Sequence, residues 1–218
     1  VYGELMDTFE QARRGGLALT DSGWSLQLAL VRHVGQQWRE ADYGIWEMRG
    51  PPRHFTFSKV MAWVTFDRAI QAVEHHGLTG PVEEWRAVRE EIHSDICARA
   101  FDQQECTFRA TFDGKTLDAS LLLLAQVGFI EPDDTRYVGT VEAAEELGEF
   151  LRGLPPGGFD HLRAGRGQHD RPRPPVARVL LPAHFFNEAA YKVKATLAQA
   201  WTLLMEETST SSTLELDF

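Results

Sequence analysis

Residues 55–77, "FTFSKVMAWVTFDRAIQAVEHHG", constrain the fold of this chain more than any other segment. Their apolar side chains lie at helical spacing on more than one face, which is typical of a helix buried on several sides. Gly77 can end this helix as a left-handed cap. A helix that is apolar on several faces needs other elements to cover it, so we expect further helices to pack around residues 55–77.

Several other segments have the periodicity of such neighbours. An apolar stripe from Trp85 to Ile96 makes residues 81–101 a clearly amphipathic helix. Residues 106–114 alternate instead and end in Asp-Gly, which predicts a short strand and turn. We therefore predict a mostly α protein of paired helices. The remaining expected helices are a segment from Tyr2 that Gly15 ends, a segment capped by Thr20, Asp21 or Ser22 that runs to Trp38, and residues 117–129, 133–153 and 185–207.

The composition limits the classes of function. The chain has 218 residues and a formal net charge of −10, which disfavours nucleic acid or an anionic membrane as its general partner. Cys97 and Cys106 lack metal-site spacing, and we expect two reduced thiols in a cytoplasmic protein. No apolar run approaches the roughly 18 residues of a transmembrane helix, and no signal peptide is found. Because the chain begins inside a helical pattern without Met, we expect it to be cut from something longer.

The character of the sequence changes at residue 153. Residues 153–183 are rich in Gly, Pro and Arg and have no periodicity, which indicates a linker. The alternative is a segment after a change of reading frame, because GC-rich DNA read out of frame gives this composition. Residues 184–218 combine a helical segment of uncertain origin with a frayed tail. We therefore expect one domain at 1–152 followed by these two segments, and sequencing the gene in all frames tests the frame change.

The loop "ADYGIWEMRGPPRHF", residues 41–55, places Glu47 directly after Trp46 in a stretch with two Gly and two Pro. One interpretation is structural, with the aromatic ring covering a core and the charges facing water. The other is chemical, because an aromatic wall disfavours the charged form of a neighbouring carboxyl group and so suits a general acid. The same ring can stack on a sugar, and the Gly residues let the backbone approach a ligand closely.

Residues 43–70, "YGIWEMRGPPRHFTFSKVMAWVTFDRAI", resemble the bacterial form of glycoside hydrolase family 15, the glucoamylase-like enzymes that include glucodextranases and bacterial trehalases. Three further stretches agree with this family in order and spacing, and together they extend the resemblance over residues 1 to about 152. These stretches are 1–24 ("VYGELMDTFEQARRGG" and "DSGW"), 83–102 ("EEWRAVREEIHSDICARAFD") and 117–143 ("LDASLLLLAQVGFIEPDDTRYVGTVEA").

The resemblance implies both a fold and a chemistry. The fold is part of an (α/α)6 toroid with its active site in loops at one end of the helix ring. The chemistry is inverting hydrolysis of α-linked glucosides, in which a carboxylic acid protonates the leaving oxygen and a second carboxylate, roughly 6.5–9.5 Å away, activates water. By motif match, Glu47 is the general acid, Trp46 contacts the sugar and the Ile45 carbonyl holds a hydroxyl. The resemblance implies no metal and no organic cofactor.

The family pattern is incomplete in this chain. Met48 stands where fungal members usually have a second Glu, a difference that is common in the bacterial form. The family's catalytic base lies in a late motif similar to Leu-Leu-Ser-Glu-Glu-Tyr, and no match to that motif is found. Part of a toroid also leaves apolar helix faces exposed, which predicts instability or aggregation.

Four other residues in or near the matching motifs are predicted to bind substrate: Arg49, His54, Lys59 and Asp118. Arg49 can hydrogen-bond sugar hydroxyls. His54 either lines the pocket or braces the loop. Lys59, on a buried helix, has a carboxylate as its alternative partner, and Asp118 has the role of a helix N-cap as its alternative.

Three functions remain open on the sequence alone. The first is an inverting hydrolase whose partner is a small neutral α-glucoside, either a maltooligosaccharide or trehalose. The second is a related glycoside phosphorylase, in which phosphate itself attacks and no carboxylate base is needed. The third is a catalytically incomplete fragment that only binds sugar or a protein partner. The oligomeric state is not predicted.

Overall fold

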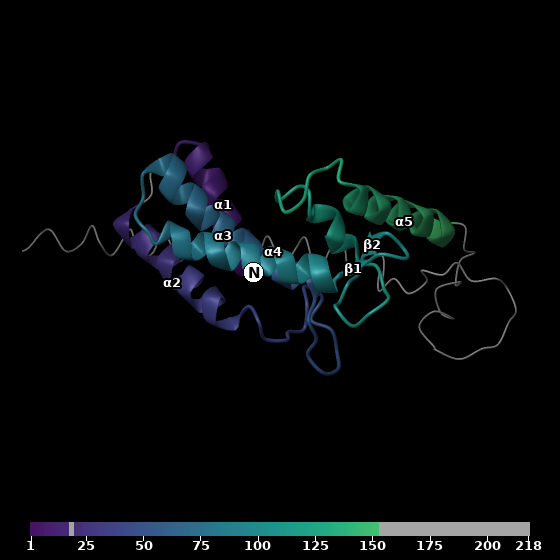
Figure 1. Ribbon diagram of the computed structural model, residues 1–218. Helices are drawn as coiled ribbons and strands as arrows, with labels where there is room; N and C mark the ends of the chain where they lie inside the picture. The colour runs from purple at the N-terminus through teal and green to yellow at the C-terminus, as the bar shows by residue number, and fades with distance from the viewer. Residues whose placement is uncertain (18–19, 153–218) are drawn as a thin grey trace, which may run out of the picture.

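The computed structural model describes residues 1–17 and 20–152, and this part of the chain is mostly helical (Figure 1). The expected segments at 153–183 and 184–218 lie outside the described residues. No helix in the described part is long and apolar enough to cross a membrane. In chain order the elements are the helices α1 (Tyr2–Arg14), α2 (Asp21–Gln37), α3 (Thr56–His76) and α4 (Val82–Arg99), the strands β1 (Phe101–Asp102) and β2 (Thr107–Phe108), the 3-10 helix η1 (Ala119–Leu123) and helix α5 (Thr135–Arg152).

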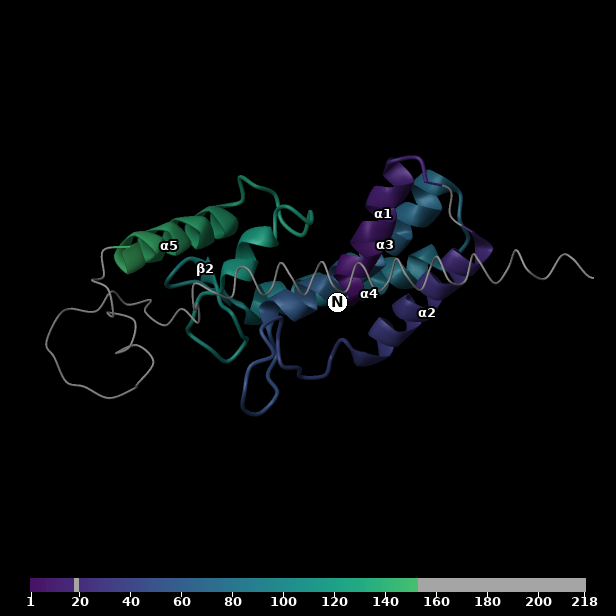
Figure 2. The ribbon, with the colours of Figure 1, turned by 180° about the vertical axis from the view of Figure 1, so that it is seen from behind.

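Helix α3 lies at the centre of the packing, as its sequence predicts. Fifteen of its 21 residues are buried, and residues 59–70 are buried without interruption, so only its last turn is exposed to solvent. Helices α1 and α4 pack most extensively against α3, and both ribbon views place α3 between them (Figures 1 and 2). Gly3 brings α1 unusually close, because a Cβ at that position would lie 2.2 Å from the Met61 carbonyl oxygen.

The helix ends follow from local chemistry. The Thr20 hydroxyl accepts a hydrogen bond from the Gly23 N–H (3.2 Å), so Thr20 is the N-cap of α2 among the three residues predicted for that role. Gly77 ends α3 in the left-handed region, with φ of 70°, and so confirms the predicted cap. The start of α2 and the end of α3 were therefore each readable from a single residue.

The structure departs from the sequence-based prediction at the end of α4. The helix ends at Arg99 rather than at residue 101, because Phe101 and Asp102 form β1 and pair in antiparallel fashion with Phe108 and Thr107 of β2. The strand predicted within 106–114 thus exists as two residues of a short ribbon, and its partner was not predicted.

A second departure concerns the helix predicted over residues 117–129. Only a 3-10 helix forms there, closed by i→i+3 hydrogen bonds such as Leu121 N–H to the Asp118 carbonyl (3.0 Å) and Leu124 N–H to the Leu121 carbonyl (3.2 Å). In a 3-10 helix, side chains at i and i+3 lie above one another. Leu121 and Leu124 are accordingly both fully buried, and Leu122 is exposed.

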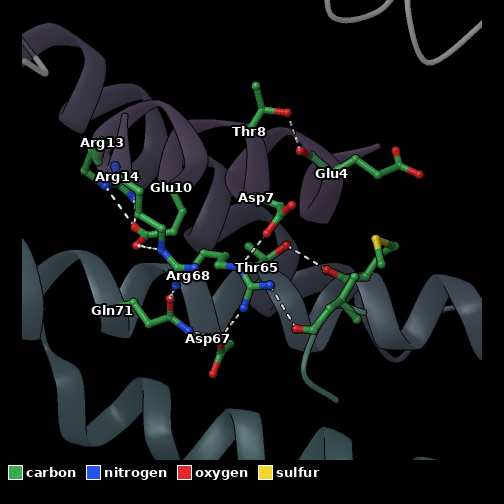
Figure 3. A network of polar contacts seen from close by, with 12 residues as sticks. Glu4, Asp7, Thr8, Glu10, Arg13, Arg14, Thr65, Asp67, Arg68 and Gln71 are labelled. Atoms are coloured by element: carbon green, nitrogen blue, oxygen red, sulfur yellow. Dashed lines mark hydrogen bonds and ion pairs between the residues drawn. The ribbon is translucent and has the colours of Figure 1, made fainter. Parts of the chain in front are cut away.

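A buried polar network joins α1 to α3 (Figure 3). Arg68 of α3 donates through Nε to Asp7 Oδ1 of α1 (2.6 Å), through Nη1 to Asp67 Oδ2 (2.5 Å) and through Nη2 to the Val127 carbonyl (2.9 Å). The guanidinium side chain is 8% exposed, so its three bonds satisfy a charge that water barely reaches.

A neighbouring cluster surrounds Glu10 of α1, whose side chain is 1% exposed. Arg13 donates to Glu10 Oε2 (3.0 Å) and to Gln27 Oε1 of α2 (2.8 Å), while Arg14 donates to Glu10 Oε1 (3.0 Å). His76, at the end of α3, lies 3.2 Å from the same carboxylate. The carboxylate therefore joins α1 to α3, and Arg13 extends the cluster to α2.

The observed arrangement agrees with the predicted fold class, a mostly α chain that forms part of an (α/α)6 toroid with a short β turn near 106–114. Consecutive helices pack against α3, and the connecting loops at 41–55 and 101–118 meet where α3 begins. The Thr56 N–H donates to the Ala110 carbonyl (2.9 Å), which fixes this meeting point.

Candidate active site

The loop that carries Glu47 is closed at its base by a pair of backbone hydrogen bonds. Asp42 and Arg53 form an antiparallel bridge, with both N–H to carbonyl distances at 2.8 Å. Inside this closure, the Glu47 N–H donates to the Gly44 carbonyl (3.2 Å) and the Met48 N–H donates to the Tyr43 carbonyl (2.8 Å). These two bonds have the 5→2 and 6→1 pattern that ends many helices at a left-handed residue.

Glu47 occupies that left-handed position, with φ of 48°. Gly is the usual residue there because it has no Cβ to meet the following carbonyl oxygen. For other L-residues the left-handed conformation costs roughly 1–2 kcal/mol. Glu47 is exposed and Trp46 is half-buried, so of the two residues the aromatic one contributes more to holding the turn against the protein.

Asp42 and Gly44 shape the start of this turn. The Gly44 N–H donates to Asp42 Oδ1 (2.6 Å), which also accepts a hydrogen bond from the Ser58 hydroxyl on α3 (2.8 Å). A Cβ on Gly44 would lie 2.8 Å from the Phe55 ring, and φ at this position is 70°. The sequence-based prediction missed Asp42 as a residue that shapes this turn, although Asp two residues before Gly is a common turn signal.

Trp46 and Asp118, 72 residues apart in sequence, are in direct contact. The indole Nε1–H donates to Asp118 Oδ2 at 2.7 Å. The other oxygen, Oδ1, accepts from the Ser120 N–H (2.8 Å) and caps η1. The alternative role predicted for Asp118, an N-cap, is confirmed, and its substrate-binding role stays a prediction.

The second loop is fastened to the first on the other side. Arg53 donates to Asp113 Oδ1 through Nε (3.1 Å) and Nη2 (2.8 Å). This pairing, led by the hydrogen bonds from Arg53, holds the pKa of the Asp113 carboxyl below its ordinary value. The Phe112 N–H donates to the His54 carbonyl (3.0 Å), and the two rings stack with centroids 5.8 Å apart. The two loops therefore form one unit.

Lys59 is buried, with its side chain 5% exposed. Its ammonium donates to the Glu40 carbonyl and lies 3.7 Å from Asp42 Oδ2. Burial lowers the pKa of Lys59 from its ordinary value, and the nearby Asp42 carboxylate opposes that shift. The predicted alternative, a carboxylate partner, is confirmed, so Lys59 braces the base of the loop.

A cavity of about 490 Å³ opens beside this base. Of the predicted site residues, it receives His54 and Lys59. His54 lines this cavity, and its stacking on Phe112 agrees with the alternative that it braces the loop; its substrate-binding role stays a prediction. The remaining lining residues come from the end of α2 and from α4: Trp38, Arg39, Glu91, Ser94, Asp95 and Arg99.

The predicted site residues therefore fall into two groups. Trp46, Glu47 and Asp118 gather at the turn, and His54 and Lys59 lie at the cavity. Ile45 is half-buried and packs against the core, and Arg49 is exposed near Glu47 in sequence. Within residues 1–17 and 20–152, no group of three His, Cys, Asp or Glu side chains has the geometry of a metal site. The turn can present a carboxyl group beside an aromatic ring, which suits proton donation to a sugar.

Comparison with known proteins also indicates a family of proteins that act on sugars. The profile of the family described as glycosyl hydrolases family 15 matches residues 1–157. A trehalase of Mycobacterium tuberculosis is 38% identical over 150 residues, covering 68% of this chain and 22% of its own length. A trehalase of Thermoplasma acidophilum is 32% identical over 145 residues, which cover 66% of this chain and 25% of the length of that trehalase.

A trehalase of Mycolicibacterium smegmatis is 37% identical over 150 residues, covering 68% of this chain and 22% of its own length. The chain thus spans about a quarter of the length of these curated relatives. No solved structure gives a significant match. The family profile covers well over half of the 218 residues, and the chain therefore belongs to family 15 of the glycosyl hydrolases.

Proposed function

We propose that this chain carries the acid half of an inverting α-glucosidase site, with Glu47 as the general acid and trehalose as the substrate. The observation that carries the proposal is the backbone of Glu47. A Glu at φ of 48°, in a turn where Gly is cheaper, is the kind of backbone strain that tends to persist at functional sites. Its exposed carboxyl group follows a Trp that is anchored from another loop.

In this proposal each group has a defined task. The Glu47 carboxylic acid gives its proton to the glycosidic oxygen while the bond from that oxygen to C1 breaks. A water molecule attacks C1 from the opposite face, and a second carboxylate takes the proton that the water loses. The two products are neutral sugars, and for trehalose both are glucose. Glu47 is left ionised and regains its proton from solvent.

Trp46 supports the sugar in this scheme. The indole has one hydrogen-bond donor, and that donor is engaged with Asp118, so the group it can offer a ligand is its ring. Aromatic rings pack well against the apolar faces of sugars. Arg49 and the Ile45 carbonyl are proposed to hydrogen-bond hydroxyls. We favour trehalose over maltooligosaccharides because the relatives named above are trehalases.

A second candidate is a sugar-binding fragment without catalysis. It is favoured by one observation, the short span of the chain against its curated relatives. The family's base motif is also not found in the sequence. A phosphorylase is the remaining alternative, and its requirement for inorganic phosphate sets it apart.

The test uses the purified 218-residue chain with trehalose and, in parallel, maltose. Glucose release is measured in buffer alone, with azide and with inorganic phosphate. Azide attacks C1 without losing a proton, so it needs no base but still needs an acid for the leaving oxygen. We expect azide-dependent release from trehalose that falls by about 10²–10⁴-fold in Glu47→Gln, the range of general acid–base catalysis.

The other outcomes are each informative. Release in buffer alone means that the chain contains a base. Release only with phosphate assigns a phosphorylase. Trehalose binding by calorimetry without release in any condition supports the binding fragment, and neither binding nor release by a folded protein overturns both candidates.

A further inference from the structure

We propose that Asp118 is a positioning residue, which holds the Trp46 indole and thereby fixes the direction in which Glu47 projects. The sequence motif predicts that Asp118 binds substrate, and the contacts assign it a different role. The inference rests on the proposed function of Glu47. Its structural half can nevertheless be tested without any turnover.

The carboxylate of Asp118 is divided between two tasks. Oδ2 accepts the Trp46 indole N–H at 2.7 Å, and Oδ1 accepts the Ser120 N–H at 2.8 Å. Bonds to an ionised acceptor are roughly twice as strong as neutral ones. Asn has one oxygen and could perform one of these tasks, and Ser could cap η1 but not reach Trp46. Asp supplies one oxygen for each task.

The support beneath Asp118 is fixed to the core. Leu121 and Leu124 of the same segment are fully buried, and Ser120 is 6% exposed. Beyond them, Arg68 donates to the Val127 carbonyl at 2.9 Å. Figure 3 shows that the same guanidinium is held between α1 and α3 by Asp7 and its neighbours. The segment that carries Asp118 is therefore tied at its far end to the buried helix pair.

The turn that receives this contact needs outside support. Glu47 has a left-handed backbone, and a strained conformation persists only when surrounding structure over-determines it. Two backbone bonds close the turn locally, and the packing of Phe55 against Gly44 restrains its start. Trp46 directly precedes Glu47, so a fixed indole limits the rotation of the peptide that joins them. A general acid depends on such placement, since reacting groups must be held in a near-attack geometry.

The decisive variant is Asp118→Ser, which keeps an N-cap for η1 and removes the acceptor for Trp46. The readout is the indole N–H resonance of Trp46 in a spectrum of the ¹⁵N-labelled chain, assigned with Trp46→Phe. We expect this resonance to shift and its exchange with water, together with that of the amides of 44–48, to become about tenfold faster or more. Trp24 is an internal reference, because its indole donates to the Thr79 carbonyl (3.0 Å) away from the turn.

Ser120→Ala is the matched control. It removes one hydroxyl that donates to Asp118 Oδ1 but leaves the backbone donor and the Trp46 contact. We expect it to leave the Trp46 resonance in place. Unchanged Trp46 and turn exchange in a folded Asp118→Ser chain would overturn the proposal.

The kinetic arm separates this proposal from that for Glu47. With azide and trehalose, we expect Asp118→Ser to lower kcat because the acid is misplaced, and any rise in KM to come from the released Trp46 ring. A raised KM with unchanged kcat would instead make Asp118 a sugar ligand and overturn the positioning role. If the wild-type chain releases no glucose, the proposed function fails, and the resonance and exchange measurements still decide whether Asp118 positions the turn.

Discussion

The interface between α1 and α3 and the turn at 43–48 use charged residues in opposite ways. At the interface, Arg68 and Glu10 are buried and each has several oppositely charged or polar partners. At the turn, Glu47 is exposed on a strained backbone. The first arrangement serves stability, because a buried charge must be paired. In the proposed function, the second gives up some stability to place a catalytic carboxyl group.

The largest expected effect comes from breaking the interface network. Arg68→Met removes the guanidinium that pairs with the buried Asp67 at 2.5 Å and with Asp7 at 2.6 Å, and leaves Asp67 paired with Arg89 at 2.7 Å. Leaving a buried charge unpaired costs about 3–5 kcal/mol, and because Arg89 still pairs with Asp67, we expect a loss near the lower end of that range. Urea denaturation should show this loss in the free energy of unfolding.

The control for Arg68 is Arg39→Met. The Arg39–Glu91 pair has side chains 56% and 51% exposed, so its loss should cost about 1 kcal/mol or less. Equal losses in the two variants would contradict the distinction between buried and exposed pairs.

The next effect tests how tightly α1 meets α3. A Gly→Ala change inside a helix normally stabilises by about 0.5–1 kcal/mol. Gly3→Ala should instead destabilise by about 1–3 kcal/mol, because its Cβ would lie 2.2 Å from the Met61 carbonyl oxygen. Gly35→Ala on α2 is the matched control, since its nearest contact is the Phe66 ring at 3.6 Å. We expect the thermal midpoint of unfolding to rise in Gly35→Ala and to fall in Gly3→Ala.

A smaller effect of opposite sign is expected at the turn. Glu47→Gly should raise the free energy of unfolding by about 1 kcal/mol, because Gly adopts the left-handed conformation without strain. Cys106, with φ of 53°, is the other non-Gly residue of this kind among those described, and Cys106→Gly serves as control. A loss of stability in Glu47→Gly, with a gain in Cys106→Gly, would mean that the Glu47 side chain supports the fold.

The contribution of the buried Glu10 to stability is expected to depend on pH in the acid range. Burial opposes the ionisation of Glu10, but hydrogen bonds from His76, Arg14 and Arg13 outweigh burial and hold its pKa below the ordinary value of 4.5. A lowered folded-state pKa contributes stability above about pH 4.5, and this contribution is lost as pH falls through the folded pKa. As the pH is lowered from about 5 to about 3, the free energy of unfolding should therefore fall more steeply in wild type than in Glu10→Gln. Parallel curves would contradict this role for Glu10.

The sequence predicted the parts of the molecule that depend on local periodicity. The buried helix α3 and the start of α2 at Thr20 follow from apolar spacing and a cap residue. Residues 117–129 were wrongly predicted as an α-helix, because a run of Leu fits i→i+3 and i→i+4 spacing alike. The pairing of Phe101 with Phe108 was missed because two-residue strands carry almost no pattern.

The candidate site was predicted only in part, for a similar reason. The motif around Glu47 identifies its residue types, but not the left-handed backbone that holds them. The contact between Trp46 and Asp118 joins residues 72 positions apart, and no local pattern encodes it. Asp42 was missed although it organises both Gly44 and Ser58, because its role depends on where the loop folds back on α3.

The measurement that tests the central claim most directly is azide-supported glucose release from trehalose by Glu47→Gly beside Cys106→Gly. Both substitutions relax a left-handed residue, and only the first removes a carboxyl group. We predict that Cys106→Gly keeps the wild-type rate and that Glu47→Gly loses about 10²-fold or more while remaining folded. Equal rates in the two variants would show that Glu47 is not the acid and would contradict the account.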